Sequence, residues 1–264
     1  MSPHTSHHEN PARPTGLTGL STGRTETGRT ESGPDTGRTE TGRTETGPDT
    51  GRKESSGPAF TVGFDLDMTL IDSRPGIRAA FSALSAETGV YIDVDLTTTR
   101  LGPPLELELA HWFPADQIEP IADRYRALYP EHAIEPTLAM PGARAALAAV
   151  RALGGRTIVV TAKYEPNAKL HLERLGIEAD AVIGSLWAEA KAEALREYGA
   201  GVYVGDHTGD VRGARTAGAL SVAVATGPCG ADELRSAGAD VVLDDLTAFP
   251  EWVRGHVGYV RERA

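Results

Sequence analysis

Two aspartates lie two residues apart at the end of an apolar segment, in the stretch "FTVGFDLD" that runs from residue 60 to residue 67. Ionised carboxylates are costly at the end of a buried strand, so this placement indicates a chemical use. Asp65 can act as a nucleophile and form an aspartyl-phosphate. Asp67 can protonate the leaving oxygen and then activate water. An isolated aspartate has a pKa of about 3.9, so Asp67 needs burial or neighbours to hold a proton at neutral pH.

Further polar residues occupy matching positions later in the chain: Thr161, Lys191, Asp206 and Asp210. Thr161 and Asp206 end predicted strands, and the carboxyl ends of parallel strands meet at one edge of a sheet. Carboxylates gathered there repel one another by about 4 kcal/mol per pair at 4 Å and an effective dielectric of 20, so a cation is expected among them. Oxygen ligands favour Mg²⁺, which also accepts a substrate phosphate. Lys191 adds a second positive charge, and Thr161 offers a hydroxyl to a phosphoryl oxygen.

The elements that must position these residues alternate along the chain, which predicts an α/β fold with a parallel sheet covered on both faces. Strands are predicted over 60–65, 157–161, 181–185, 201–206, 220–226 and 240–243. Helices are predicted over 75–89, 105–113, 118–129, 141–153, 167–175, 188–198, 210–217 and 231–236. No strand is expected between Ser73 and Pro136, so the first strand is followed by a helical insert.

Residues 1–58 differ from the rest of the chain. A 14-residue sequence, "GRTETGRTESGPDT", occupies 23–36 and recurs over 37–50 with one change, Ser32 against Thr46. It contains no aliphatic or aromatic residue, so residues 1–58 are predicted to be a disordered low-complexity tail. The tail has 7 Lys and Arg against 8 Asp and Glu, so nearly all of the net charge of −11 lies in the remainder.

The acidic charge argues against nucleic acid and anionic membranes as partners. Cys229 is the only cysteine, there is no apolar leader, and no apolar run approaches 18 residues. We therefore expect a protein of a reducing compartment, the cytoplasm, with no disulfide and no membrane span. The expected ligand is a small phosphorylated metabolite, and the sequence leaves open whether the chain is a monomer or a homodimer.

In order and spacing, "DLDMTL", "VVTAK", Lys191 and "GDHTGD" resemble the four motifs of the haloacid dehalogenase (HAD) superfamily, over about residues 60–245. The resemblance implies a Rossmann-like core over 59–73 and 138–264, with a helical C1 cap over 74–137. It implies Asp65 as nucleophile, Asp67 as acid and base, and Mg²⁺ held by the Asp65 side chain, the Asp67 carbonyl and Asp206, with Asp210 as a ligand or a support. "LIDSRPGI", "RLGPPLELEL" and "MPGARAAL" resemble the phosphoglycolate phosphatase branch.

Several points stay open at this stage. Met68 stands where the superfamily usually has glycine, and Lys163 rivals Lys191 for the lysine role because only 15 residues separate Lys191 from Asp206. Asp210 could also cap the following helix. Candidate substrate-binding residues are listed together: Arg74, Arg100, Ala162 and Lys163. The predicted function is a Mg²⁺-dependent phosphomonoester hydrolase that acts on a small phosphorylated metabolite, with phosphoglycolate as a candidate by resemblance alone. The alternatives are a phosphomutase and a non-catalytic interaction protein of the same fold.

Overall fold

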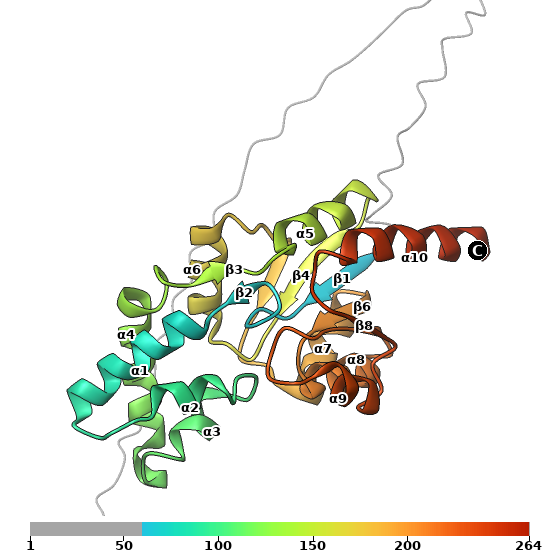
Figure 1. The fold of residues 1–264 in the computed structure, drawn as a ribbon. Coiled ribbons are helices and arrows are strands. Elements are labelled where there is room, and N and C mark those ends of the chain that lie inside the picture. Colours follow the sequence, from blue (N-terminus) through green and yellow to red (C-terminus); the bar gives the residue numbers. More distant parts are fainter. Residues whose placement is uncertain (1–59, 264) are drawn as a thin grey trace, which may run out of the picture. The chain divides into compact units, whose positions relative to one another are not determined.

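The predicted parallel sheet is confirmed in a computed structural model, which describes residues 60–263, with side chains described to residue 259 (Figure 1). The predicted disorder of residues 1–58 concerns a segment outside the described residues. Six parallel strands lie in the order β5-β4-β1-β6-β7-β8. They are β1 (Thr61–Phe64), β4 (Arg156–Val160), β5 (Ala181–Ile183), β6 (Ala200–Gly205), β7 (Leu220–Val224) and β8 (Val241–Leu243). The first strand therefore lies in the middle of the sheet, between the strands that precede Thr161 and Asp206.

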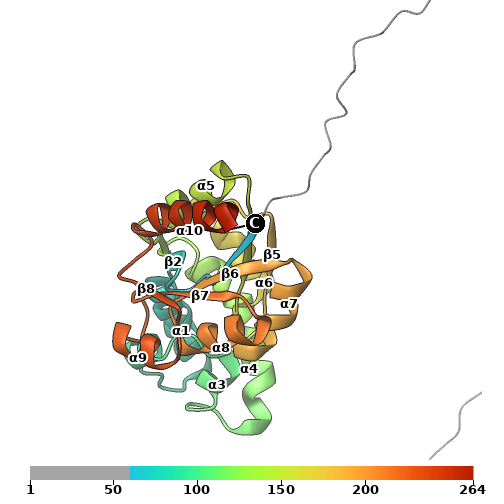
Figure 2. The same cartoon turned by 90° about the vertical axis from the view of Figure 1, so that its right-hand side faces the viewer.

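Helices cover both faces of the sheet (Figures 1 and 2). They are α5 (Ala143–Ala152), α6 (Glu165–Leu175), α7 (Lys191–Glu197), α8 (Thr208–Ala217), α9 (Ala231–Ser236) and α10 (Phe249–Arg263), with the 3-10 turn η2 (Ala188–Ala190) before α7. Successive residues of β4 point to opposite faces: Val159 packs in the cluster that includes α5 and α10, and Ile158 and Val160 pack in the cluster that includes α7 and α8. This alternation explains why the consecutive residues Ile158, Val159 and Val160 are all apolar.

Residues between β1 and α5 form a separate helical group. It contains α1 (Arg74–Thr88), α2 (Val94–Thr98), α3 (Leu105–Leu109), the 3-10 turn η1 (Ala115–Gln117) and α4 (Ile118–His132). Its hydrophobic cluster includes Phe81, Leu84, Tyr125 and Tyr129, and every buried member lies between residues 77 and 133. The cap over 74–137 remains a prediction, which this separate cluster favours.

Several elements depart from the sequence predictions, and one of them, α2, lies where no helix was predicted. The short strands β2 (Ile71–Asp72) and β3 (Leu138–Ala139) pair antiparallel where the chain leaves and re-enters the core. Helix α4 continues past Pro130 to His132, because a proline this close to the end removes few backbone hydrogen bonds. Helix α10 has no counterpart among the predicted helices, and it buries Phe249, Val253 and Val257 at intervals of four residues.

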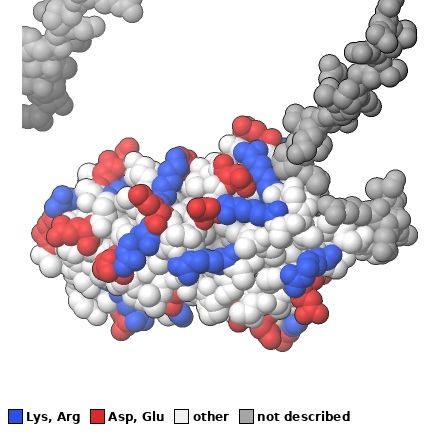
Figure 3. Space-filling view, turned by 90° about the horizontal axis from the view of Figure 1, so that it is seen from above, with Lys and Arg blue, Asp and Glu red and all other residues white. Residues whose placement is uncertain are grey.

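The surface carries charges of both signs. On the face drawn in Figure 3, Lys and Arg side chains lie beside Asp and Glu side chains rather than in one continuous basic field. Among the described residues, none of the helices combines the length and apolar character that crossing a membrane requires. The predicted exclusion of nucleic acid and membranes, and the predicted cytoplasmic location, stay predictions.

Candidate active site

The loop after β1 is a tight turn that fixes the direction of two carboxylates. The Asp65 N–H donates to the Val204 carbonyl on β6 at 2.8 Å. The Leu66 carbonyl then accepts from the N–H groups of Thr69, Leu70 and Ile71, at 3.3, 2.8 and 3.0 Å. The chain therefore reverses within a few residues of β1 and leaves Asp65 and Asp67 at the carboxyl edge of the sheet.

Met68 is the residue that this turn strains. Its φ is 60°, in the left-handed region, which for a residue other than glycine costs roughly 1–2 kcal/mol. The side chain is buried, and the Met68 carbonyl accepts from the Thr226 hydroxyl at 2.6 Å. The backbone at residue 68 therefore favours glycine, which is the residue that the superfamily pattern has at this position. In this chain, burial of the Met68 side chain and the hydrogen bond to its carbonyl offset the cost of the left-handed conformation.

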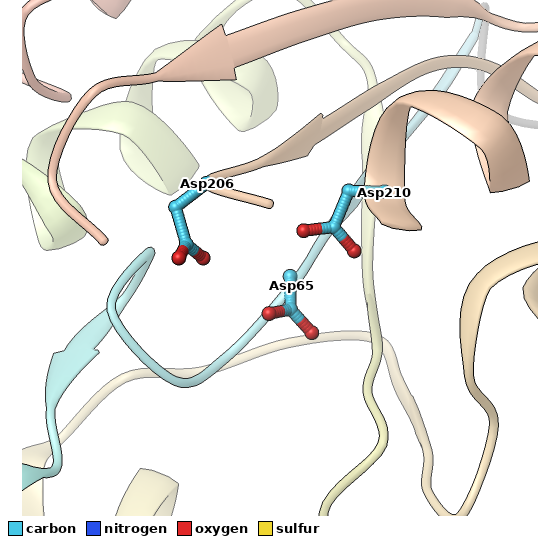
Figure 4. A group of neighbouring side chains, drawn as sticks. All are labelled: Asp65, Asp206 and Asp210. Carbon is cyan, nitrogen blue, oxygen red and sulfur yellow. The ribbon is translucent and has the colours of Figure 1, made fainter. Parts of the chain in front are cut away.

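Three carboxylates converge beside this turn (Figure 4). Asp65 follows β1, Asp206 follows β6, and Asp210 lies in the first turn of α8. Each is less than 10% exposed, and each offers an oxygen within 4.8 Å of an oxygen of the others. Gly227 allows this close approach, because a Cβ there would lie 1.7 Å from Asp206 Oδ2. The structure therefore brings together three of the four predicted carboxylates.

Lys191 is the cation that two of these carboxylates, Asp65 and Asp210, share. Its side chain is 1% exposed, and its Nζ donates to Asp65 Oδ1 at 2.9 Å, Asp210 Oδ1 at 2.7 Å and the Tyr203 hydroxyl at 2.8 Å. The Tyr203 hydroxyl donates in turn to the Val160 carbonyl at 2.6 Å. Lys191 is the first residue of α7 and reaches the edge directly, so the short interval to Asp206 does not keep it away.

Burial changes the acidity of this group. Burial raises the pKa of Asp65 to about 7, even though Lys191 acts in the opposite direction. Burial, with Asp210 and Asp65 nearby, raises the pKa of Asp206 well above its ordinary value. Burial lowers the pKa of Lys191, but Asp210 and Asp65 outweigh it, and the net pKa is raised. One lysine does not compensate three buried carboxylates, and their oxygens form a donor set that fits a hard divalent cation such as Mg²⁺.

Asp67 belongs to a second, adjacent pair. Lys163 Nζ lies 2.9 Å from Asp67 Oδ1 and 4.8 Å from the centre of the Tyr129 ring. Burial raises the pKa of the Asp67 carboxyl, but Lys163 and the Ser73 hydroxyl outweigh it, so the pKa is lowered overall. Each predicted catalytic aspartate therefore has a lysine of its own: Lys191 for Asp65 and Lys163 for Asp67.

Thr161, Thr69 and Asp210 support the arrangement in different ways. The Thr161 hydroxyl accepts from the Lys163 N–H at 3.2 Å, next to the Asp67 pair. The Thr69 hydroxyl donates to Asp206 Oδ1 at 2.8 Å; sequence analysis assigned Thr69 no role, because its partner lies 137 residues away. The suggestion that Asp210 caps α8 is corrected in detail: the N-cap is His207, and Asp210 accepts from the His207 N–H at 3.1 Å as the third helical residue.

The candidate substrate residues separate into two places. Arg100, Ala162 and Lys163 line a cavity of about 290 Å³ that also contains Asp67. Arg74 lies outside it, lines a different cavity and pairs with Asp72 through contacts of 2.8 and 2.7 Å. The structure thus brings three of the four candidates to Asp67 and does not bring Arg74 there.

Comparisons with known proteins agree with this geometry. A family model described as haloacid dehalogenase-like hydrolase matches residues 62–215. The tyrosine-protein kinase PtkA of Mycobacterium tuberculosis is 32% identical over 198 residues, which cover 70% of this chain and 68% of the relative. A phosphoglycolate phosphatase of Chromobacterium violaceum is 31% identical over 211 residues, covering 70% of this chain and 92% of the relative. A haloacid dehalogenase-like family hydrolase from Streptococcus pneumoniae superposes with a TM-score of 0.65 at 26% identity, covering 75% of this chain and 98% of that chain.

Proposed function

This chain belongs to the haloacid dehalogenase-like hydrolases and is an enzyme of their phosphatase type, and we propose that it hydrolyses small phosphate monoesters through an aspartyl-phosphate on Asp65, with Mg²⁺ as cofactor. The observation that carries the proposal is the buried group of Asp65, Asp206 and Asp210 with Lys191 bonded to two of them. Phosphoglycolate enters the proposal as a candidate substrate because relatives of this chain carry that name.

The first step assigns one oxygen of Asp65 to attack. Oδ1 accepts from Lys191, which orients the carboxylate and leaves Oδ2 to bond to phosphorus. As that bond forms, the bond from phosphorus to the leaving oxygen breaks, and Asp67 gives the leaving oxygen a proton. A dianionic phosphate competes with Asp67 for Lys163, which weakens the ion pair and favours the protonated Asp67 that this step needs.

The second step returns the site to its starting state. Asp67 takes a proton from water, the water oxygen bonds to phosphorus, and the bond from phosphorus to Asp65 breaks to release inorganic phosphate. The lowered pKa of Asp67 beside Lys163 suits this basic role. Asp65, Asp206 and Asp210 would hold the Mg²⁺, with the Asp67 carbonyl as a further ligand, and the ion would neutralise charge on the transferring phosphoryl group when bound.

The test is phosphate release from a panel of small esters with Mg²⁺, with Asp65→Asn compared with wild type. We expect Asp65→Asn to abolish release while the fold is kept, and Asp232→Asn, at an exposed aspartate paired with Arg235, to behave as wild type. EDTA should abolish release and Mg²⁺ should restore it. Activity in Asp65→Asn, or indifference to chelation, would contradict the nucleophile or the metal respectively.

The kinase name of one relative supports a second candidate, transfer of a phosphoryl group to tyrosine in place of water. Label from γ-labelled ATP should appear on protein tyrosine if this second activity is present. A phosphomutase, which would share the same core residues, would be recognised by an isomerised sugar phosphate instead of free phosphate.

A further inference from the structure

The residues that line the cavity of about 290 Å³ containing Asp67 indicate which chemical group the cavity accepts. Asp67 is the residue proposed to protonate the leaving oxygen, so whatever occupies this cavity is the organic part of the ester. A volume of this size corresponds to roughly ten water molecules in the liquid. It is therefore larger than a two-carbon leaving group needs.

The charged residues of the cavity wall cancel one another. Six of them line it, three acidic and three basic: Asp67, Glu106, Glu108, Arg100, Arg126 and Lys163. Lys163 pairs with Asp67 at 2.9 Å, Arg126 pairs with Glu106, and Arg100 pairs with Glu108. Among the described residues that line the cavity, every cation thus has an acidic partner within it.

Of these three ion pairs, the one between Arg100 and Glu108 has two hydrogen bonds between its side chains. Arg100 Nε and Nη2 donate to the two Glu108 oxygens at 2.9 and 2.6 Å, which is the bidentate geometry an incoming carboxylate would need. Trp112 Nε1 also donates to Glu108, at 3.0 Å, and fixes its position. A carboxylate on the substrate would therefore have to displace Glu108 to reach Arg100.

The rest of the wall is mainly aromatic and apolar, with Thr97, Asn167 and Ser185 as its uncharged polar side chains. The rings of Phe81 and Tyr125 have centroids 4.6 Å apart, Tyr125 and Tyr129 follow at 5.5 Å, and Leu105 also lines the cavity. One buried donor in the wall, Arg126 Nε, has no hydrogen-bond partner within the part of the chain that the structure describes. It can donate to an uncharged oxygen of a bound group, whereas the ring faces favour an apolar or aromatic group.

We propose that the natural leaving group is uncharged and aromatic or comparably apolar, and that Glu108 excludes carboxylate-bearing esters by occupying Arg100. This inference rests on the proposed phosphatase function and narrows its substrate class, away from phosphoglycolate. Of the residues involved, only Asp67 and Lys163 also have a proposed part in the transfer of the phosphoryl group, and the others act on the organic part of the ester.

Wild-type enzyme tests the substrate class directly. Benzyl phosphate and phosphoglycolate both release an alkoxide, so they differ chiefly in what the cavity must accept. We expect kcat/KM for benzyl phosphate to exceed that for phosphoglycolate by about tenfold or more. Calorimetry with the non-hydrolysable analogues 2-phenylethylphosphonate and 3-phosphonopropionate, in the presence of Mg²⁺, should show the same order of binding. Equal or tighter binding of 3-phosphonopropionate, or preference for phosphoglycolate, would overturn the proposal.

Glu108→Gln tests whether Glu108 excludes carboxylate-bearing esters by occupying Arg100. It frees the Arg100 charge while keeping an acceptor for Trp112, and we expect kcat/KM for phosphoglycolate to rise about tenfold with benzyl phosphate changed less than about twofold. The matched control is Glu87→Gln, which frees Arg124 on the exposed surface outside the cavity and should change neither value. An unchanged phosphoglycolate value in folded Glu108→Gln would overturn the role of Glu108. No phosphate release from any ester, with the analogue preference intact, would contradict the phosphatase function and not the cavity assignment.

Discussion

Replacing Lys191 by methionine should destabilise the protein far more than the same change at an exposed lysine. Methionine keeps most of the side-chain volume, so the packing is retained and the charge is removed. Lys191 Nζ makes three buried hydrogen bonds, and its loss leaves Asp65 and Asp210 without their shared cation and removes a nearby positive charge from Asp206. Carboxylate oxygens within 4.8 Å repel by about 3 kcal/mol per pair at an effective dielectric of 20. Removing one partner of a buried ion pair costs about 3–5 kcal/mol, and we expect a loss in that range.

The assay is urea unfolding at pH 7.5 in EDTA, which gives the free energy of unfolding by linear extrapolation. Lys169→Met is the matched control, because Lys169 makes an exposed pair with Glu165 that should contribute about 0–1 kcal/mol. Since small proteins have about 5–15 kcal/mol of total stability, Lys191→Met should still show a cooperative transition, at lower urea.

The loss of stability in Lys191→Met should depend on pH, and the direction of that dependence follows from the pKa values of the buried carboxylates. Without Lys191, the folded-state pKa values of Asp65 and Asp206 should be raised further above their unfolded values, because Lys191 lowers both in the wild type. Such groups favour folding at low pH, and that contribution is lost as the pH rises through the folded-state pKa, which for Asp65 is already about 7 in the wild type. The deficit of Lys191→Met should therefore narrow between pH 7.5 and pH 5, and Mg²⁺ should reduce it at pH 7.5. A deficit under about 1 kcal/mol at pH 7.5 in EDTA, or one that does not narrow, would refute Lys191 as the counter-charge.

Two other predictions follow from the same geometry. Gly227→Ala should lower phosphate release by about 100-fold, since its Cβ would meet Asp206 Oδ2 at 1.7 Å and displace that carboxylate, whereas Gly230→Ala, with open space at its Cβ, should leave the rate unchanged. Burial lowers the pKa of His171 to about 3, so the unfolded state binds a proton that the folded state does not, and the contribution of His171 to the free energy of unfolding should fall as the pH drops below about 6.5, by up to about 1.4 kcal/mol per pH unit. Urea unfolding at pH 7 and pH 5 should therefore show that lowering the pH disfavours folding more in wild type than in His171→Asn, and an equal change in both would contradict this assignment.

The central strands were predictable because their apolar, β-branched runs end in glycine or polar residues, and predicted and observed bounds agree to within about two residues. Helix α10 carried a weaker signal, with only Phe249, Val253 and Val257 buried along its described part. The antiparallel pair of β2 and β3 is two residues long on each side, too short for any periodicity to appear. These elements depend on contacts between distant segments, which local pattern does not encode.

In the site, too, some features were predictable from the sequence and others were not. The positions of Asp65, Asp206 and Lys191 follow from strand ends and alternation, which sequence contains. The hydrogen bond from Thr69 to Asp206 and the one from Lys191 to Tyr203 depend on which strands are neighbours and how α7 packs. Tyr203 in particular lies in an apolar strand, where its pattern indicates core packing and its hydroxyl gives no separate signal.

The competition between two lysines for one role has a different resolution, because each lysine holds its own aspartate. Lys191 bonds to Asp65 and Lys163 pairs with Asp67. When all are ionised, the four predicted carboxylates carry four negative charges and the two lysines two positive ones. The remaining charge of two matches one divalent cation, which supports Mg²⁺ as the ion that lets Asp65 be ionised, and so nucleophilic, at neutral pH despite its burial. By the same count the edge would be neutral with Mg²⁺ bound, so a phosphate dianion could approach it without net repulsion although the protein is acidic as a whole.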